Sequence, residues 1–134
     1  MRTILYIDDD EQYAWMIKTL LGKRGFIVET ACDGLEGMRK ARQLQPDLIL
    51  LDMYLPRIDG LEVVEQLRSE SPTRHIPIVV MSALPTHSSR KLLQGVDVQD
   101  VVSKPFQLEE LLNTVSRNLA KRAVTWNAPS PANV

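Results

Sequence analysis

Short apolar runs recur along the whole sequence, each too short to form a typical helix. Two of them, ILYI (4–7) and LILL (48–51), do not alternate apolar and polar positions, which is typical of parallel strands buried on both faces. The other runs are FIVETA (26–31), IPIVVMS (76–82) and VQDVVS (98–103). Together these runs predict five strands at the centre of the fold.

The segments between the runs carry apolar residues at helical spacing. These residues are Ile58, Leu61, Val64 and Leu67 in one segment, and Leu108, Leu111, Leu112, Val115 and Leu119 in the last. Because strand and helix alternate, and because buried parallel strands need helices on both sides, we expect a doubly wound α/β sheet. Ligands of such sheets bind beyond the carboxyl ends of the strands, so a functional site is expected there.

The composition limits the possible partners and compartment. With 134 residues, 44% of them hydrophobic, the chain suits one ordinary domain. We expect this domain over residues 1–121 and a flexible tail or linker start over 122–134. The net charge of −1 offers no general attraction to nucleic acid or anionic lipid. Cys32 cannot form an internal disulfide, and no signal peptide or membrane-length apolar run is seen, so a cytoplasmic location without membrane contact is expected.

Polar side chains gather where the predicted strands end. They are Asp8, Asp9 and Asp10 after the first strand, Asp52 after the third, Ser82 at the end of the fourth and Lys104 after the fifth. Because the carboxyl ends of parallel strands meet at one edge, these side chains should converge. Two carboxylates about 5 Å apart repel by about 3 kcal/mol at an effective dielectric of 20, so positive charge must accompany them.

The expected chemistry at this edge is phosphoryl transfer. Lys104 supplies one positive charge, and an all-oxygen cluster is also a natural site for a hard cation such as Mg²⁺. An Asp carboxylate beside such a cation can accept a phosphoryl group as an acyl phosphate. Asp52, on the central strand, is the best candidate acceptor. Asp10 and Asp59 are instead interpreted as N-caps of the helices that follow them.

Four stretches together resemble the receiver domain of two-component response regulators, the CheY-like family. They are IDDD after the first strand, LLDMYLPRIDG around the third, VVMSA at the fourth and VVSKPF at the fifth. They occur in the family's order over residues 2 to about 120. The resemblance implies a flavodoxin-like fold, with a five-stranded parallel sheet in the order 2-1-3-4-5 flanked by five helices.

The resemblance implies a signalling switch rather than an enzyme with turnover. Asp52 would be the phosphoacceptor, Ser82 the switch hydroxyl and Lys104 the phosphate-binding cation. A histidine kinase or a histidine phosphotransfer protein would donate the phosphoryl group, and the domain would catalyse only its own phosphorylation and dephosphorylation. A protein target or a second copy would bind the face formed by the fourth helix, the fifth strand and the fifth helix. No direct contact of this domain with nucleic acid is expected.

The resemblance also implies the ligands of the metal. Asp8, Asp9 and Asp52 would hold Mg²⁺ together with the backbone carbonyl of Tyr54, Asp9 directly and Asp8 through water. It further implies a cis peptide bond before Pro105.

Two features differ from the usual pattern of the family. The position on the fifth strand that often holds a mobile aromatic ring is Val101, so movement at Ser82 would have to be read through the following loop or the fourth helix. Tyr54 and Leu84, two residues after the acceptor and the switch hydroxyl, would flank the path of attacking water. Because one is bulky and the other apolar, they predict slow hydrolysis of the acyl phosphate.

Two other functions fit parts of the pattern. Asp8 and Asp10 form a D-x-D, as in phosphohydrolases of the haloacid dehalogenase type, where Asp8 would be the nucleophile and Asp10 the acid/base. That family also needs a metal-binding acidic pair beyond its lysine and usually a cap, whereas KPFQL follows here and no insertion is long enough for a cap. The chain could also be a receiver-like interaction module that is not phosphorylated, although every expected site residue is present.

Overall fold

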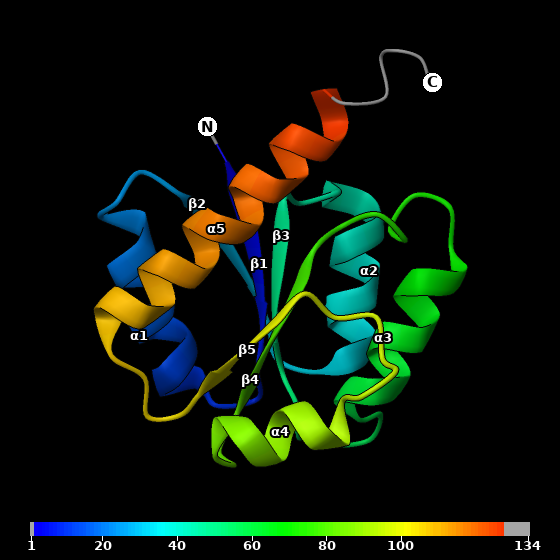
Figure 1. Cartoon of the computed structure of the whole chain (residues 1–134), viewed down its shortest axis with the longest axis horizontal. Helices are drawn as coiled ribbons and strands as arrows, with labels where there is room; N and C mark the ends of the chain where they lie inside the picture. The colour runs from blue at the N-terminus through cyan, green and yellow to red at the C-terminus, as the bar shows by residue number, and fades with distance from the viewer. Residues whose placement is uncertain (1, 128–134) are drawn as a thin grey trace.

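A parallel sheet of five strands runs through the centre of the protein (Figure 1). The computed structural model describes residues 2–127, and the side chains of residues 2–120. The strands are β1 (Thr3–Ile7), β2 (Ile27–Ala31), β3 (Leu48–Asp52), β4 (Ile78–Ser82) and β5 (Asp100–Ser103). They pair in the order β2-β1-β3-β4-β5, which confirms the predicted flavodoxin-like topology.

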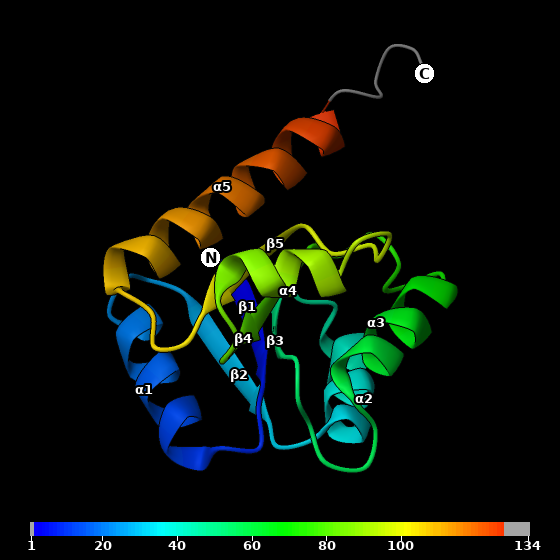
Figure 2. The same ribbon diagram turned by 60° about the horizontal axis from the view of Figure 1, so that its bottom comes forward.

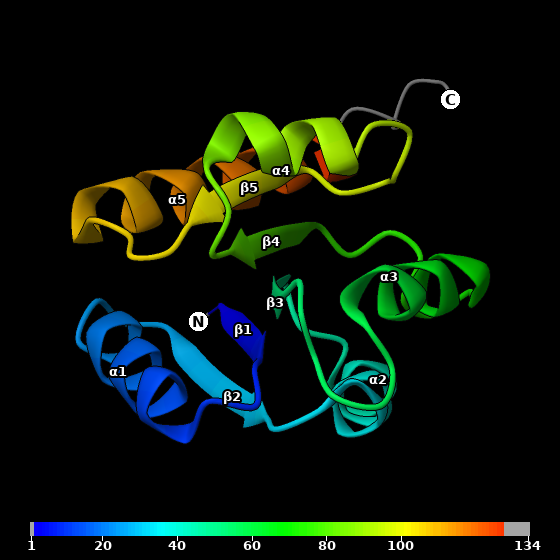
Figure 3. The same ribbon diagram turned by 90° about the horizontal axis from the view of Figure 1, so that it is seen from below.

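Five helices in the described part of the chain cover both faces of the sheet. They are α1 (Glu11–Gly22), α2 (Gly34–Leu44), α3 (Gly60–Ser69), α4 (Thr86–Leu92) and α5 (Leu108–Asn127). Figure 3 looks onto the carboxyl edge of the sheet, with α1 and α5 on one side and α2 and α3 on the other. In Figure 2, α4 comes forward and lies close to β5. The doubly wound arrangement is therefore as predicted.

Each strand contributes side chains to two apolar layers. Tyr6 and Leu50 pack with residues of α1 and α5, whereas Ile7 and Leu51 pack with residues of α2 and α3. The alternation follows from the two-residue period of a strand. Because both faces of the central strands β1 and β3 are covered, most of their positions are apolar, which explains why runs such as LILL show no polar alternation.

Aspartates begin three of the helices. The side chains of Asp10, Asp33 and Asp59 accept hydrogen bonds from backbone N–H groups three residues further on, which confirms the predicted caps at Asp10 and Asp59. After Asp59, a Cβ atom on Gly60 would lie 2.8 Å from the carbonyl oxygen of Met53. Only glycine therefore allows the chain to return so close to the end of β3.

Some boundaries differ from those read from the sequence. Strand β4 begins at Ile78 rather than at residue 76, because Pro77 has no N–H to give to the sheet. Helix α5 continues to Asn127, past the expected domain boundary at residue 121. Residues 128–134 of the predicted tail lie outside the described residues, so its flexibility stays a prediction. None of the helices described is both long and apolar enough to cross a membrane.

Candidate functional site

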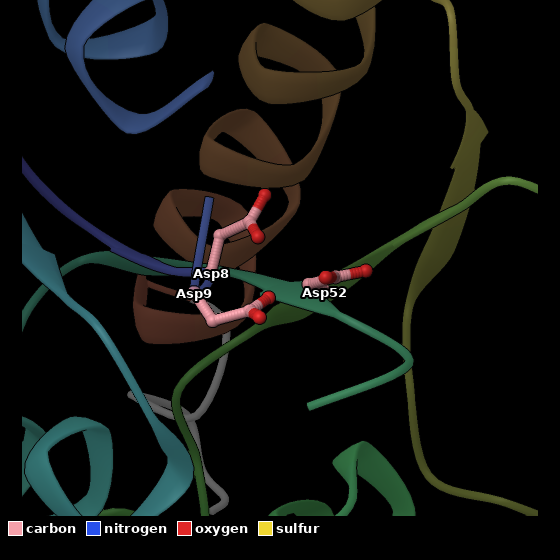
Figure 4. A group of neighbouring side chains, drawn as sticks. All are labelled: Asp8, Asp9 and Asp52. Atoms are coloured by element: carbon pink, nitrogen blue, oxygen red, sulfur yellow. The ribbon is translucent and has the colours of Figure 1, made fainter. Parts of the chain in front are cut away.

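Three carboxylates meet at the carboxyl edge of the sheet (Figure 4). Asp8 and Asp9 follow β1, and Asp52 is the last residue of β3. Each offers an oxygen atom, and these atoms lie within 4.8 Å of one another. Asp8 is 2% exposed and Asp52 is 9% exposed, whereas Asp9 is exposed to solvent. The expected convergence of these acids is found, and together they could hold a metal ion.

The register of the strands explains why the acids adjoin. Strands β1 and β3 pair with Ile7 opposite Leu51, so the residues that follow, Asp8 and Asp52, lie next to each other. Tyr6, two residues before Asp8, faces α1 and α5. The two-residue period of the strand puts Asp8 on that same side.

Lys104, one residue beyond β5, brings a positive charge to the acids. Its Nζ atom lies 2.8 Å from Oδ2 of Asp8 and 3.8 Å from Oδ1 of Asp52. The ammonium also lies 4.3 Å from the centroid of the Tyr13 ring, a cation–π contact that helps to hold the long side chain over the site. The peptide bond between Lys104 and Pro105 is cis, as the resemblance implied.

Asp8 is held by three hydrogen-bond donors. Its Oδ2 atom accepts from Lys104 and from the hydroxyl of Tyr6, and its Oδ1 atom accepts from the backbone N–H of Asp10 at 3.0 Å. Burial acts to raise the pKa of Asp8, but these hydrogen bonds outweigh burial and hold that pKa below its usual range. Reading ILYI as a plain apolar run missed Tyr6. The available signal was a hydroxyl two positions before an acid, on the same face of one strand.

The pKa of Asp52 is shifted in the opposite direction from that of Asp8. Burial, reinforced by the charge of Asp8, raises the pKa of Asp52 to about 7, and the attraction of Lys104 lowers it only in part. One lysine therefore does not compensate the charge of the acids. An oxygen-only donor set that lacks positive charge suits a hard divalent cation such as Mg²⁺. The residues present at this edge thus fit the predicted metal.

Ser82 lies on the strand next to Asp52. Strands β3 and β4 pair with Asp52 opposite Met81, so Ser82 is one residue further along the neighbouring strand. Its side chain is fully buried, and its Oγ atom accepts the backbone N–H of Leu84 at 3.1 Å. Tyr54, in the loop after β3, is 57% exposed. Leu84 is half-buried in the loop after β4.

Hydroxyl groups connect the loop after β4 to β5. The Oγ atom of Ser103 donates to the carbonyl oxygen of Leu84 at 3.1 Å and lies 2.8 Å from Oγ1 of Thr86. Val101 is 6% exposed and packs in the apolar layer on the side of α2 and α3. The sequence alone did not reveal these links, because they join residues 17 and 19 positions apart.

The side chain of Asp10 caps α1 and is not part of the acidic cluster. Its Oδ1 atom accepts the backbone N–H of Tyr13 at 3.0 Å, as the cap of α1. Among the described residues, the group of acids that could hold a metal consists of Asp8, Asp9 and Asp52. This use of Asp10 argues against its being the acid/base of a hydrolase in which Asp8 is the nucleophile.

The profile of the response regulator receiver domain matches residues 4–116. RpaA of Synechocystis, a "DNA-binding dual master transcriptional regulator", is 40% identical over 124 residues, which are 91% of this chain and 50% of RpaA. The chain thus spans about half the length of this relative.

Solved structures give the same fold. The chemotaxis response regulator CheY4 of Vibrio cholerae superimposes with a TM-score of 0.82 at 30% identity, covering 88% of this chain and 98% of CheY4. The receiver domain of the sensor histidine kinase PA1611 of Pseudomonas aeruginosa gives 0.81 at 27% identity, covering 89% of this chain and 98% of that domain. The PA1611 structure is described as having a magnesium ion coordinated in its active site cleft.

Proposed function

The chain belongs to the response regulator receiver domain family of two-component systems, and on that premise we propose that it is a phosphoacceptor switch. In this proposal Asp52 accepts a phosphoryl group from the phosphohistidine of a histidine kinase or a histidine phosphotransfer protein. The phosphorylated domain then has a changed affinity for a target. The observation that carries the proposal is the position of Asp52, next to Asp8 and 3.8 Å from the ammonium of Lys104.

Asp52 supplies the nucleophile in this scheme. One carboxylate oxygen forms a bond to phosphorus while the bond from phosphorus to the donor nitrogen breaks, and the electron pair stays on that nitrogen. The attack needs the ionised carboxylate, which the nearby Lys104 favours. Burial at the end of a central strand keeps the oxygen in a fixed position, which favours reaction once the donor has docked.

The other charged residues compensate the phosphoryl oxygens. Mg²⁺ held by Asp8, Asp9 and Asp52 with the backbone carbonyl of Tyr54 would neutralise negative charge on the phosphoryl group. The close spacing of the acids and the magnesium described for the PA1611 domain support this assignment. Lys104 is near enough to both Asp8 and Asp52 to turn toward the new phosphoryl group.

Readout passes through the loop after β4 in this proposal. The Ser82 hydroxyl turns toward the phosphoryl group and gives up the N–H of Leu84 that it now accepts. The carbonyl of Leu84 is tied to Ser103, which is in turn hydrogen-bonded to Thr86 on α4. A displacement of this loop therefore changes the contacts between α4 and β5, and this route needs no aromatic ring at Val101.

Two surfaces suit the two kinds of partner. On α1, Trp15 is 70% exposed and lines a cavity of about 410 Å³ that also reaches Asp8, so we assign this surface to the phosphohistidine donor.

The face of α4, β5 and α5 has a hollow of about 440 Å³. There the carboxylate of Asp100 accepts hydrogen bonds from Arg90 at 3.2 Å and from Arg117 at 2.5 Å. We assign this polar face to a target or a second copy of the chain. The net charge of −1 gives this domain no general attraction to nucleic acid.

The test is incubation with acetyl phosphate and Mg²⁺, followed by mass spectrometry of the intact chain. The proposal predicts a lasting gain of one phosphoryl group that Asp52→Asn abolishes. Asp59→Asn makes the same chemical change at an exposed helix cap, which asparagine also forms, and it should leave the gain intact.

Other outcomes would contradict the proposal. Continuous turnover of acetyl phosphate that depends on Asp8 would favour the hydrolase, and the absence of both mass gain and turnover would favour an interaction module. A mass gain that survives Asp52→Asn would place the phosphoryl group on another residue.

A further inference from the structure

A buried tyrosine hydroxyl reaches the acidic cluster from inside the core. Tyr6 lies on β1, is 0% exposed, and packs among apolar residues of α1 and α5. Its hydroxyl donates a hydrogen bond to Oδ2 of Asp8. A phenol buried this deeply needs an acceptor because water cannot reach it, and the acceptor here is the innermost carboxylate of the proposed metal site.

We infer that Tyr6 is a positioning residue, which holds the Asp8 carboxylate in the orientation needed to bind a divalent cation together with Asp9 and Asp52. The inference rests on the proposed function and extends it to a residue that does not itself touch the cation. Its basis is the distribution of donors, because Tyr6 and Lys104 both bind Oδ2 of Asp8. The opposite oxygen, Oδ1, accepts only a backbone N–H among the hydrogen bonds of the described residues.

Tyr6 and Lys104 differ in how permanent their contact with Asp8 is. Lys104 is a long, flexible side chain that also lies 3.8 Å from Asp52, and in the proposed function it turns toward the phosphoryl group. Tyr6 is fully buried in the apolar layer beside α1 and α5, and this packing holds its hydroxyl against Asp8 when Lys104 turns away. When Lys104 moves, the hydroxyl of Tyr6 remains as the side-chain donor that keeps the buried Asp8 satisfied and in place.

Replacing Tyr6 by phenylalanine tests the role of the hydroxyl separately from that of the aromatic ring. Tyr6→Phe keeps the aromatic packing and removes only the hydrogen bond to Asp8. Loss of a group that hydrogen-bonds a metal-binding carboxylate commonly weakens metal affinity by 10- to 100-fold. We therefore expect the dissociation constant for Mg²⁺ or Mn²⁺ to rise about tenfold in Tyr6→Phe.

The experiment measures cation binding directly, by isothermal titration calorimetry of the unphosphorylated protein with Mg²⁺ and with Mn²⁺. The rate of phosphorylation by acetyl phosphate, followed as a function of Mg²⁺ concentration, gives a second readout. For Tyr6→Phe the half-saturating Mg²⁺ concentration should rise by a similar factor, while the rate at saturating Mg²⁺ stays close to that of wild type. A general loss of structure would instead lower the saturating rate.

Thr73→Val is the matched control. Thr73 is 0% exposed, and its hydroxyl donates to the carbonyl oxygen of Leu67 at 2.7 Å. It precedes β4 and therefore lies toward the opposite edge of the sheet. This variant also loses one buried hydroxyl, but its cation affinity should remain that of wild type.

The outcomes separate this inference from the proposed function. Wild-type protein with no saturable cation site would overturn both. Wild-type binding that Tyr6→Phe leaves unchanged would overturn the role of Tyr6 alone, as would an equal loss of affinity in Thr73→Val.

Discussion

Replacing the proposed phosphoacceptor by asparagine should stabilise the unphosphorylated protein. Burial and the neighbouring Asp8 raise the pKa of Asp52 from 3.8 to about 7. Between these two values the native protein holds a proton that the unfolded chain releases, so the free energy of unfolding falls as the pH rises. The contribution of Asp52 to stability is present below the lower value and lost above the higher one. Asp52→Asn removes a carboxyl that is unfavourable when ionised.

The size of the effect follows from the two pKa values. The difference between 3.8 and about 7 corresponds to about 4 kcal/mol at a pH above both. Because solvent at the sheet edge screens the charge, we take about half of this, or about 2 kcal/mol. With an unfolding entropy of about 2.1 cal/mol/K per residue for 134 residues, the melting temperature should rise by about 7 °C.

Thermal unfolding at several pH values checks this prediction. In EDTA at pH 8, Asp52→Asn should melt about 7 °C above wild type, and the difference should be largely lost at pH 4. Added Mg²⁺ should narrow the difference at pH 8, because a cation compensates the acids only while they are ionised. Asp59→Asn is the control and should show no such pH-dependent gain. The reasoning is refuted if Asp52→Asn is no more stable than wild type at pH 8, or if its advantage does not change with pH.

Three further predictions concern the lifetime of the acyl phosphate, its readout and its source. Opening the path of water with Tyr54→Asn and Leu84→Glu together should speed loss of the phosphoryl group at least about tenfold. Intact mass followed over time in Mg²⁺ measures this, and unchanged decay would contradict it. Ser103→Ala should leave the rate of phosphorylation intact but reduce the difference in hydrogen exchange that phosphorylation causes in the loop after β4. An undiminished difference would remove Ser103 from the readout. Trp15→Ala should slow transfer from a phosphohistidine protein but not from acetyl phosphate, and equal effects on both donors would contradict docking at this surface.

Most of the fold could be predicted because the strands are buried on both faces. A run such as LILL (48–51) has nowhere to expose a side chain, so its composition alone indicates a covered parallel strand. The convergence of side chains at the strand ends was predictable because parallel strands bring their carboxyl ends to one edge. Asp8 and Asp52 needed only the correct register to adjoin.

The unpredicted features depend on contacts across the fold. Ser103 meets Leu84 and Thr86 only once β5 and the loop after β4 have packed together. Asp100 was read as part of an apolar run, yet it is 7% exposed and bonded to Arg117. A buried acid can be accepted there because a distant helix supplies the compensating charge, and no local pattern of the sequence predicts that.

In the proposed function, the alternation of side chains along each strand also separates the phosphoryl chemistry from its readout. Asp8 and Lys104 each lie two residues beyond a side chain that packs toward α1 and α5, so they gather with Asp52 on that side of the sheet edge. Ser82 lies two residues beyond a side chain of the opposite layer, the side on which Ser103 contacts α4. The strands between these groups are packed between two apolar layers, and such close packing resists displacement. A phosphoryl group at the edge can therefore act on the far side only by pulling the loops beyond the strands. In the proposed function, the readout therefore uses hydroxyl contacts in the loop after β4 and needs no aromatic ring on β5.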